Sequence, residues 1–185
     1  AAAATEEGGV ALVELDDMLR TSDLEVEALA DRTAALLDSA ERALERAFRL
    51  NPFDTRSRTW LAQVYGLQAR RLGRSEAYAR AIDELEKLAL LTPDQHSVYA
   101  MLANNYFYVS SWDGAALNYQ KAEEVYLDTY DLVVENEEQL DSVLLFSYVQ
   151  AQGDTHVKRL DAGRASSAYD RAYLFATTSE DSAYV

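Results

Sequence analysis

Two short motifs on either side of a tight turn constrain the fold of this chain more than any other feature. Leu102, Ala103 and Tyr106 recur at the three-and-four spacing of one helix face. Residues 110–114 (Ser-Ser-Trp-Asp-Gly) then predict a short turn, and a turn that short makes the flanking helices antiparallel. The second helix has a face of its own, formed by Ala115, Tyr119 and Ala122.

The alanine-led motif of this second helix recurs along the chain. Its four copies are Ala40-Leu44-Ala47, Ala81-Leu85-Leu88, Ala115-Tyr119-Ala122 and Ala165-Tyr169-Ala172. The only two prolines, Pro52 and Pro93, each lie twelve residues after a leading alanine. The two later copies have Leu127 and Thr177 at that place, which predicts helices that continue further. The first-helix motif is found as Leu61-Ala62-x-x-Tyr65, Leu102-Ala103-x-x-Tyr106 and, more weakly, Leu144-Leu145-x-x-Tyr148.

Together these motifs resemble the tetratricopeptide repeat, a helical hairpin of about 34 residues with small residues at its helix crossings. The resemblance implies an all-α fold, a right-handed α-α superhelix of about four antiparallel hairpins, some with elongated helices. The predicted hairpins span residues 10–52, 53–93, 94–136 and 137–178. Each would bury its apolar face on its neighbours. The first helix of each hairpin would line a concave face.

The domain prediction is a disordered lead-in over residues 1–9, ending in Glu6-Glu7-Gly8-Gly9, and one repeat domain over residues 10–185. Helix boundaries are expected at Thr21-Ser22-Asp23, near Asn136 and at Gln152-Gly153. The chain starts with alanines and not with methionine, so it can be a fragment. At the other end, Ser179-Glu180-Asp181 predicts the start of a further short helix. A following helix or a partner would then cover Ala168, Tyr169, Ala172 and Phe175.

Composition excludes several classes of protein. The net charge of −15 opposes binding to a phosphate backbone, so no nucleic-acid partner is expected. A hydrophobic content of 49% excludes a disordered chain. No apolar run is long enough to span a bilayer, so we expect a soluble protein without direct membrane insertion. The absence of cysteine and the Ala-rich, processed start favour an extracytoplasmic location only weakly.

No catalytic, cofactor or metal site is predicted. The two histidines, His96 and His156, are far apart and belong to no motif, and His96 is expected to be solvated. Residues 123–141 hold eight acids and no base, without the loop pattern of a calcium site, so a solvated acidic face is expected. Phosphate-binding, hydrolase and metalloprotease motifs are absent from the sequence. The sequence therefore indicates a non-enzymatic protein without a cofactor.

Charge is distributed unevenly, and two interpretations remain open. Residues 40–92 hold seven acids and ten bases, whereas residues 1–39 hold ten acids and two bases. A basic middle beside acidic ends can orient a partner. Alternatively, Glu41 and Glu45 pair with arginines of their own helix at i,i+4 spacing.

The resemblance implies a scaffold that binds a protein or peptide partner on its concave face. The alternatives are a structural piece of a larger protein or multi-subunit assembly, and a regulatory domain attached to an enzyme. Carried over to this chain, the partner-binding residues would be Arg56, Thr59, Gln63 and Leu67 in one hairpin and Ser97, Ala100, Asn104, Phe107 and Tyr108 in the next. Their amides suit hydrogen bonds to an extended peptide, and their aromatic rings would be apolar anchors.

Overall fold

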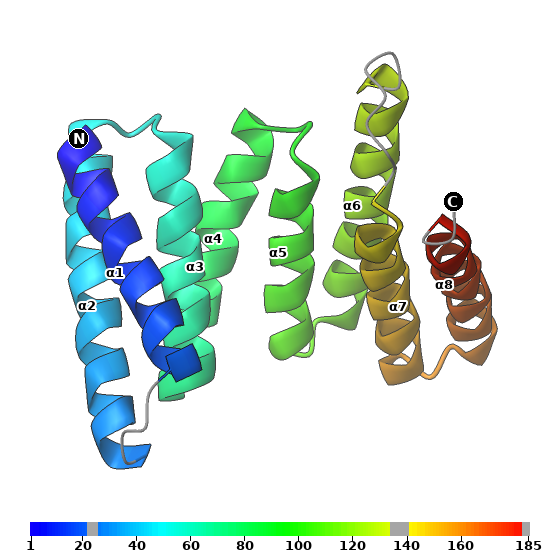
Figure 1. The fold of residues 1–185 in the computed structure, drawn as a ribbon, viewed down its shortest axis with the longest axis horizontal. Coiled ribbons are helices and arrows are strands. Elements are labelled where there is room, and N and C mark those ends of the chain that lie inside the picture. Colours follow the sequence, from blue (N-terminus) through cyan, green and yellow to red (C-terminus); the bar gives the residue numbers. More distant parts are fainter. Residues whose placement is uncertain (22–25, 134–140, 183–185) are drawn as a thin grey trace. The chain divides into compact units, whose positions relative to one another are not determined.

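The computed structural model describes residues 1–21, 26–133 and 141–182, and this part of the chain is helical without any strand. It divides into two compact units, unit 1 (residues 1–91) and unit 2 (residues 92–185). From the sequence, one repeat domain was expected over residues 10–185. In each unit, successive helices run antiparallel and pack as hairpins (Figure 1). The all-α, tetratricopeptide-like class predicted from the motifs is confirmed.

Unit 1 contains two hairpins. The first pairs α1 (Ala2–Thr21) with α2 (Val26–Leu50), and the second pairs α3 (Thr55–Leu72) with α4 (Glu76–Leu91). The Asp54 carboxylate caps α3 by accepting the backbone N–H of Arg56. Gly73 ends α3 in the left-handed conformation, which glycine adopts without a steric penalty. The two predicted proline stops are correct, because α2 and α4 end just before Pro52 and Pro93.

Unit 2 also contains two hairpins, α5 (His96–Tyr108) with α6 (Trp112–Val133), and α7 (Ser142–Lys158) with α8 (Ala162–Ser182). As predicted, α6 and α8 continue past Leu127 and Thr177. Asp141 caps α7 by accepting the backbone N–H of Leu144. The expected boundaries at residues 22–23 and at Asn136 lie outside the described residues.

The repeated motifs form the core of both units. Every alanine of the four second-helix motifs is buried, as are the central Leu44, Leu85 and Tyr119. Leu61-Ala62 and Leu102-Ala103 are buried in the first helices of their hairpins. Small side chains at these positions let neighbouring helices approach closely, and the leucines and tyrosines fill the space between them. The motif spacing therefore predicted the core correctly.

The prediction of a disordered lead-in over residues 1–9 is wrong, because α1 begins at Ala2. A β-carbon on Gly8 would lie 2.4 Å from Leu44 of α2, and one on Gly9 would lie 2.4 Å from the Trp60 ring of α3. The two glycines thus let α1 pack tightly against both helices. Thr5 is buried as well, and its hydroxyl lies 2.8 Å from that of Ser57. The glycine pair is a packing feature here and does not end a helix.

The expected helix boundary at Gln152-Gly153 is also wrong, since α7 continues to Lys158. A β-carbon on Gly153 would lie 2.5 Å from the ring of Tyr169, so this glycine makes room for α8. The turn that follows α7 contains Leu160, in the left-handed conformation with a φ of 59°. Gly153 again serves close packing between helices.

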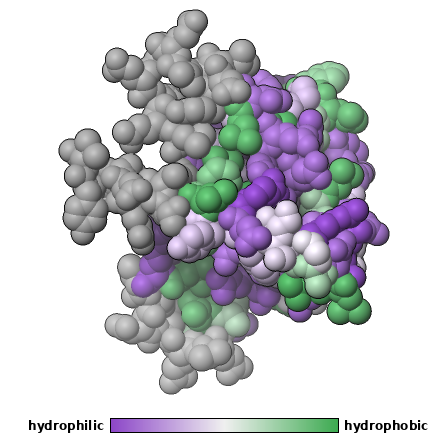
Figure 2. All heavy atoms as spheres, turned by 90° about the vertical axis from the view of Figure 1, so that its right-hand side faces the viewer, coloured by the Kyte–Doolittle hydropathy of each residue, from purple (hydrophilic) through white to green (hydrophobic). Residues whose placement is uncertain are grey.

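The C-terminal edge differs from the prediction. Helix α8 runs without interruption to Ser182, so Ser179-Glu180-Asp181 does not begin a new helix. Ala168 and Ala172 are each 3% exposed and pack with Val149 of α7. Phe175 lies against the same cluster, and Tyr169 covers Gly153. Figure 2 faces this side of the molecule, and its described residues show hydrophobic patches separated by hydrophilic ones.

The acidic and basic surfaces of unit 1 pair between helices. Arg46 and Arg32 of α2 contact Glu7 and Glu14 of α1. Glu41 and Glu45 pair with Arg80 of α4 and not with arginines of their own helix. Of the two interpretations of the charge pattern, the i,i+4 pairing does not describe Glu41 and Glu45, whose bridges join helices.

Candidate functional site

Unit 1 has an open groove between its two first helices, α1 and α3. We call it the α1–α3 groove, and its volume is about 400 Å³. Apolar surface dominates its lining. Its residues are Glu6, Gly9, Val10, Val13, Arg56 and Trp60.

The α1–α3 groove exists because Gly9 leaves room for the Trp60 ring. Val10 and Val13 are exposed, although valine side chains are normally favoured in the core. The Arg56 guanidinium lies 4.4 Å from the centroid of the Trp60 ring, at cation–π distance. The groove thus combines exposed aliphatic side chains, an aromatic ring and a cation.

The partner-binding residues predicted on α3 are all at least partly accessible. Arg56 and Gln63 are exposed, whereas Thr59 and Leu67 are half-buried. The Thr59 hydroxyl donates to the carbonyl oxygen of Thr55 at 2.8 Å, within its own helix. Of these four residues, only Arg56 lines the α1–α3 groove.

The residues predicted on α5 belong to unit 2. Asn104 and Tyr108 are exposed, and Ser97 and Ala100 are half-buried. The Asn104 side-chain oxygen accepts the Tyr119 hydroxyl at 2.7 Å, so part of its hydrogen-bonding capacity is already used. Phe107 packs edge-to-face on Trp112 with ring centroids 5.2 Å apart. Tyr108, with half of its surface exposed, is the more exposed of the two aromatic residues in this group.

A second hollow lies within unit 2, between α6, α7 and α8. We call it the α6–α8 pocket, and its volume is about 430 Å³. Most of its lining residues are polar or charged, in contrast to the α1–α3 groove. They are Gln120, Glu123, Glu124 and Leu127 of α6, Gln152 and His156 of α7, and Arg164, Ser167, Ala168 and Arg171 of α8.

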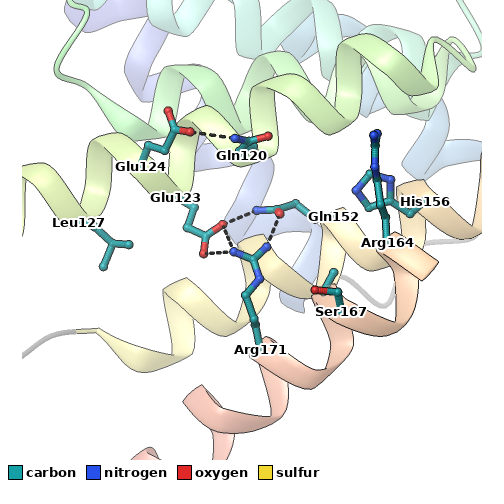
Figure 3. A pocket seen from close by; sticks show the side chains of 10 residues that line it. Gln120, Glu123, Glu124, Leu127, Gln152, His156, Arg164, Ser167 and Arg171 are labelled. Carbon is teal, nitrogen blue, oxygen red and sulfur yellow. Dashed lines mark hydrogen bonds and ion pairs between the residues drawn. The ribbon is translucent and has the colours of Figure 1, made fainter. Parts of the chain in front are cut away.

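One side of the α6–α8 pocket is formed by a hydrogen-bonded clamp of three side chains (Figure 3). Gln152 donates to Glu123 Oε2 at 2.7 Å, and Arg171 Nη1 donates to Glu123 Oε1 at 3.0 Å. Arg171 Nη2 also donates to the Gln152 side-chain oxygen at 2.8 Å. The Glu123 side chain is only 8% exposed, so these bonds compensate a buried charge. The solvated acidic face expected from the sequence is therefore wrong at Glu123.

Unit 1 contains a clamp of the same chemistry. Gln68 of α3 donates to Glu41 Oε2 at 2.7 Å, and Arg80 of α4 donates to Glu41 Oε1 at 2.7 Å. Arg80 also lies 3.9 Å from the centroid of the Tyr65 ring and donates to its hydroxyl. Burial raises the pKa of Tyr65 to about 12, so its hydroxyl stays neutral. In both units, a carboxylate of one hairpin accepts from a buried glutamine and from an arginine of the next hairpin.

The two histidines lie in unit 2, in environments that the sequence did not reveal. His96 Nδ1 lies 2.8 Å from the Tyr148 hydroxyl, and burial lowers the pKa of His96, so the expectation of a solvated side chain is wrong. His156 lines the α6–α8 pocket, and its Nδ1 is buried without a hydrogen-bond partner. Burial is the main reason that the pKa of His156 is lowered, and the positive charges of nearby arginines add to it.

The sequence analysis missed Val10, Val13 and Trp60 as groove residues, and most of the α6–α8 pocket. A usable signal was present in Gln68 and Gln152, which lie three and four residues after the motif tyrosines Tyr65 and Tyr148. That spacing places each glutamine on the apolar face of its helix, where an amide needs a buried partner. In the described ranges, no group of acidic and histidine side chains is arranged to hold a metal ion.

Comparison with known proteins supports the fold and nothing finer. The fold is a helical-repeat fold of the tetratricopeptide-like type. It resembles the crystal structure of BtubC (BKLC) from P. vanneervenii, with a TM-score of 0.59 and 18% identity over 93% of this chain and 72% of that chain. Two structures of MamA align with TM-scores of 0.42 and 0.43 at 16% identity, covering 86% and 95% of this chain and 99% and 95% of theirs.

No protein-family model matches the sequence, and no curated protein matches it. Within residues 1–21, 26–133 and 141–182, no helix is both long and apolar enough to cross a membrane.

Proposed function

We propose that this protein is a non-enzymatic scaffold that binds a segment of a protein partner on the exposed faces of its first helices. The proposal is made for each unit by itself, with α1 and α3 in unit 1 and α5 in unit 2. The main observation in support of this proposal is the α1–α3 groove. An open, mostly apolar groove is the kind of surface on which bulky side chains of a partner are buried.

The composition of the α1–α3 groove supports this function. Trp60 offers a large ring for apolar contact, and tryptophan and arginine are enriched among the residues that dominate binding energy. Val10 and Val13 extend the apolar surface along α1. The groove therefore fits a segment that carries a bulky apolar side chain.

The exposed face of α5 supports the same function in unit 2. Tyr108 is 51% exposed, and the ring of Phe107 lies next to it, with centroids 6.3 Å apart. Gln63 and Asn104 are exposed on α3 and α5, where their side chains can contact a bound peptide. Because Phe107 also packs on the core, Tyr108 is the better residue for testing this surface.

The test is a selection of peptides from a random display library against the immobilised 185-residue protein. The affinity of the enriched peptides is then measured by fluorescence polarisation. The variants Val13→Glu and Tyr108→Ala should each weaken peptides bound at their surface by about 1–2 kcal/mol, roughly five- to thirtyfold. Both side chains are exposed, so the fold should be retained, as circular dichroism can verify.

Matched controls are available on α7 and α8. Val143→Glu introduces the same charge as Val13→Glu, and Tyr173→Ala removes an exposed ring as Tyr108→Ala does. Neither control should change peptide affinity by more than about twofold. Failure to enrich any peptide, or equal loss in variants and controls, would refute the proposal and favour a structural role in a larger assembly.

A further inference from the structure

The α6–α8 pocket is the strongest unassigned feature of the molecule, because its hydrogen-bonding groups are unequally satisfied. Both oxygens of Glu123 accept from Gln152 or Arg171. In Glu124, one oxygen accepts from Gln120 and the other lies 3.5 Å from Lys121. The two carboxylates of the pocket are thus already engaged by protein donors.

Several donors of the pocket have no such partner. Arg164 contacts Asp161 through its Nε atom alone, at 3.5 Å, and its Nη atoms have no partner among the described residues. Its side chain is 66% exposed. The Ser167 hydroxyl also has no hydrogen bond to the described part of the chain. A guanidinium with unpaired Nη donors and a hydroxyl in one pocket can recognise carboxylate and phosphate oxygens.

His156 supplies the second, independent observation. The surroundings of His156 are electrically positive, because Arg159, Arg164 and Arg171 all act to lower its pKa and only Asp161 opposes them. Because Glu123 and Glu124 are already engaged by protein donors, the positive charges of these arginines favour an anion in the pocket.

In unit 1, the same kind of clamp forms, and the arginines around it are paired with carboxylates. There, Arg80 is engaged by Glu41, Glu45 and the Tyr65 ring. Arg74 is engaged by Asp38. Both arginines beside the unit 1 clamp are therefore neutralised, whereas Arg164 beside the unit 2 clamp keeps unpaired donor atoms.

We propose that the α6–α8 pocket binds a small oxyanion-bearing molecule, a carboxylate or a phosphate, held by Arg164 and Arg171. The clamp positions Arg171, whose side chain is 47% exposed. Arg164 supplies positive charge through its unpaired Nη atoms, and His156 lines the same pocket. Leu127 and Ala168 provide an apolar wall for a short carbon body. The volume of about 430 Å³ suits a small ligand.

The test titrates inorganic phosphate and, separately, acetate into the full chain at constant ionic strength set with sodium chloride. Binding is followed by NMR of the side chains of Arg164, Arg171 and His156. Saturable shifts of these signals are expected with at least one probe. Phosphate alone would identify a phosphate-bearing ligand, acetate alone a carboxylate, and both a general oxyanion site.

Two arginine variants separate specific binding from a general effect of charge. Arg164→Gln should weaken the responding probe at least fivefold. Arg42→Gln removes the same charge from an exposed position on α2 and should leave affinity within twofold. The pocket is not an oxyanion site if no probe gives saturable shifts at 50 mM or if both variants lose affinity equally. Neither variant removes a residue of the clamp, so the fold is not expected to limit the test.

Discussion

The α1–α3 groove and the α6–α8 pocket have similar volumes and opposite chemistry. The groove joins two first helices and presents valines, a tryptophan and one arginine. The pocket is formed by α6, α7 and α8 and presents amides, carboxylates, arginines and a histidine. The same hairpin architecture can thus hold an apolar hollow where glycine lets helices meet, and a polar one where charged side chains bridge the helices. The packing motifs determine the helices, and the residues between the motifs determine what each hollow can bind.

The largest expected effect on stability concerns the clamp beside the α6–α8 pocket. Replacing Arg171 with Met removes the charge that compensates the buried Glu123 carboxylate. The free energy of unfolding should fall by about 3 kcal/mol. This is the lower end of the range for a buried ion pair, because Arg171 itself is half exposed. Arg80→Met in unit 1 should cost less, since the Glu41 side chain is 18% exposed. Urea unfolding, with hydrogen exchange to assign the loss to a unit, measures both. If both variants lost the same free energy of unfolding, burial of Glu123 and Glu41 could not explain the cost.

Arg164, on the same helix as Arg171, provides a control for this prediction. Arg164 has only one weak contact, so Arg164→Met should change the free energy of unfolding by no more than about 0.5 kcal/mol. A large loss of stability in this variant would show that Arg164 has a structural role, and its unpaired donors would no longer point to a ligand.

The next effect concerns the glycine that forms the α1–α3 groove. Gly9→Ala places a β-carbon 2.4 Å from the Trp60 ring, and overpacking of this kind costs roughly 1–3 kcal/mol. The ring must move, so the fluorescence of Trp60 should change as well. Gly163→Ala is the control, because the only atom near its new β-carbon is an Asp161 oxygen at 3.9 Å. This variant should be neutral or stabilising by up to about 1 kcal/mol.

Overpacking at the motif alanines tests the repeat register in both units. Ala81→Leu in unit 1 and Ala103→Leu or Ala115→Leu in unit 2 replace fully buried alanines. Each should cost roughly 1–3 kcal/mol, read as a lower thermal midpoint. Unchanged midpoints in all three variants would mean that these positions are not close helix crossings.

These motif alanines also show how far the sequence could predict the structure. Alanines at fixed spacing and two prolines define helix faces and ends, so the hairpins and their core followed from local pattern. Gly8, Gly9 and Gly153 resemble helix breakers in the sequence, because their role depends on Leu44, Trp60 and Tyr169 from other helices. The clamp was hidden for the same reason, since Glu123, Gln152 and Arg171 meet only after α6, α7 and α8 have packed.

The smallest expected effect is a dependence of stability on pH that differs between the units. Both histidines belong to unit 2, and burial lowers the pKa of each below its ordinary value of 6.5. The unfolded chain then binds protons more readily than the folded one, so stability is full above pH 6.5 and falls as the pH drops through and below 6.5. In unit 1, burial acts to raise the pKa of Asp54, but its hydrogen bonds outweigh burial and lower the pKa, and that contribution is lost only as the pH falls below about 4.

Hydrogen exchange at pH 7.0 and 5.5 can check this difference. Protection should decrease in α5 and α7 and change little in α1–α4. Replacing both histidines with glutamine should remove most of the decrease in unit 2. A loss of protection confined to unit 1 would contradict the assignment.

The most direct test of the account uses both ligands on one isotope-labelled sample. A peptide selected against the α1–α3 groove and the oxyanion probe that responds are titrated separately, and NMR shifts are mapped along the chain. The account predicts that the peptide shifts signals of Val10, Val13 and Trp60, and that the oxyanion shifts those of His156, Arg164 and Arg171. It is contradicted if both ligands perturb the same residues, or if neither perturbs the hollow assigned to it.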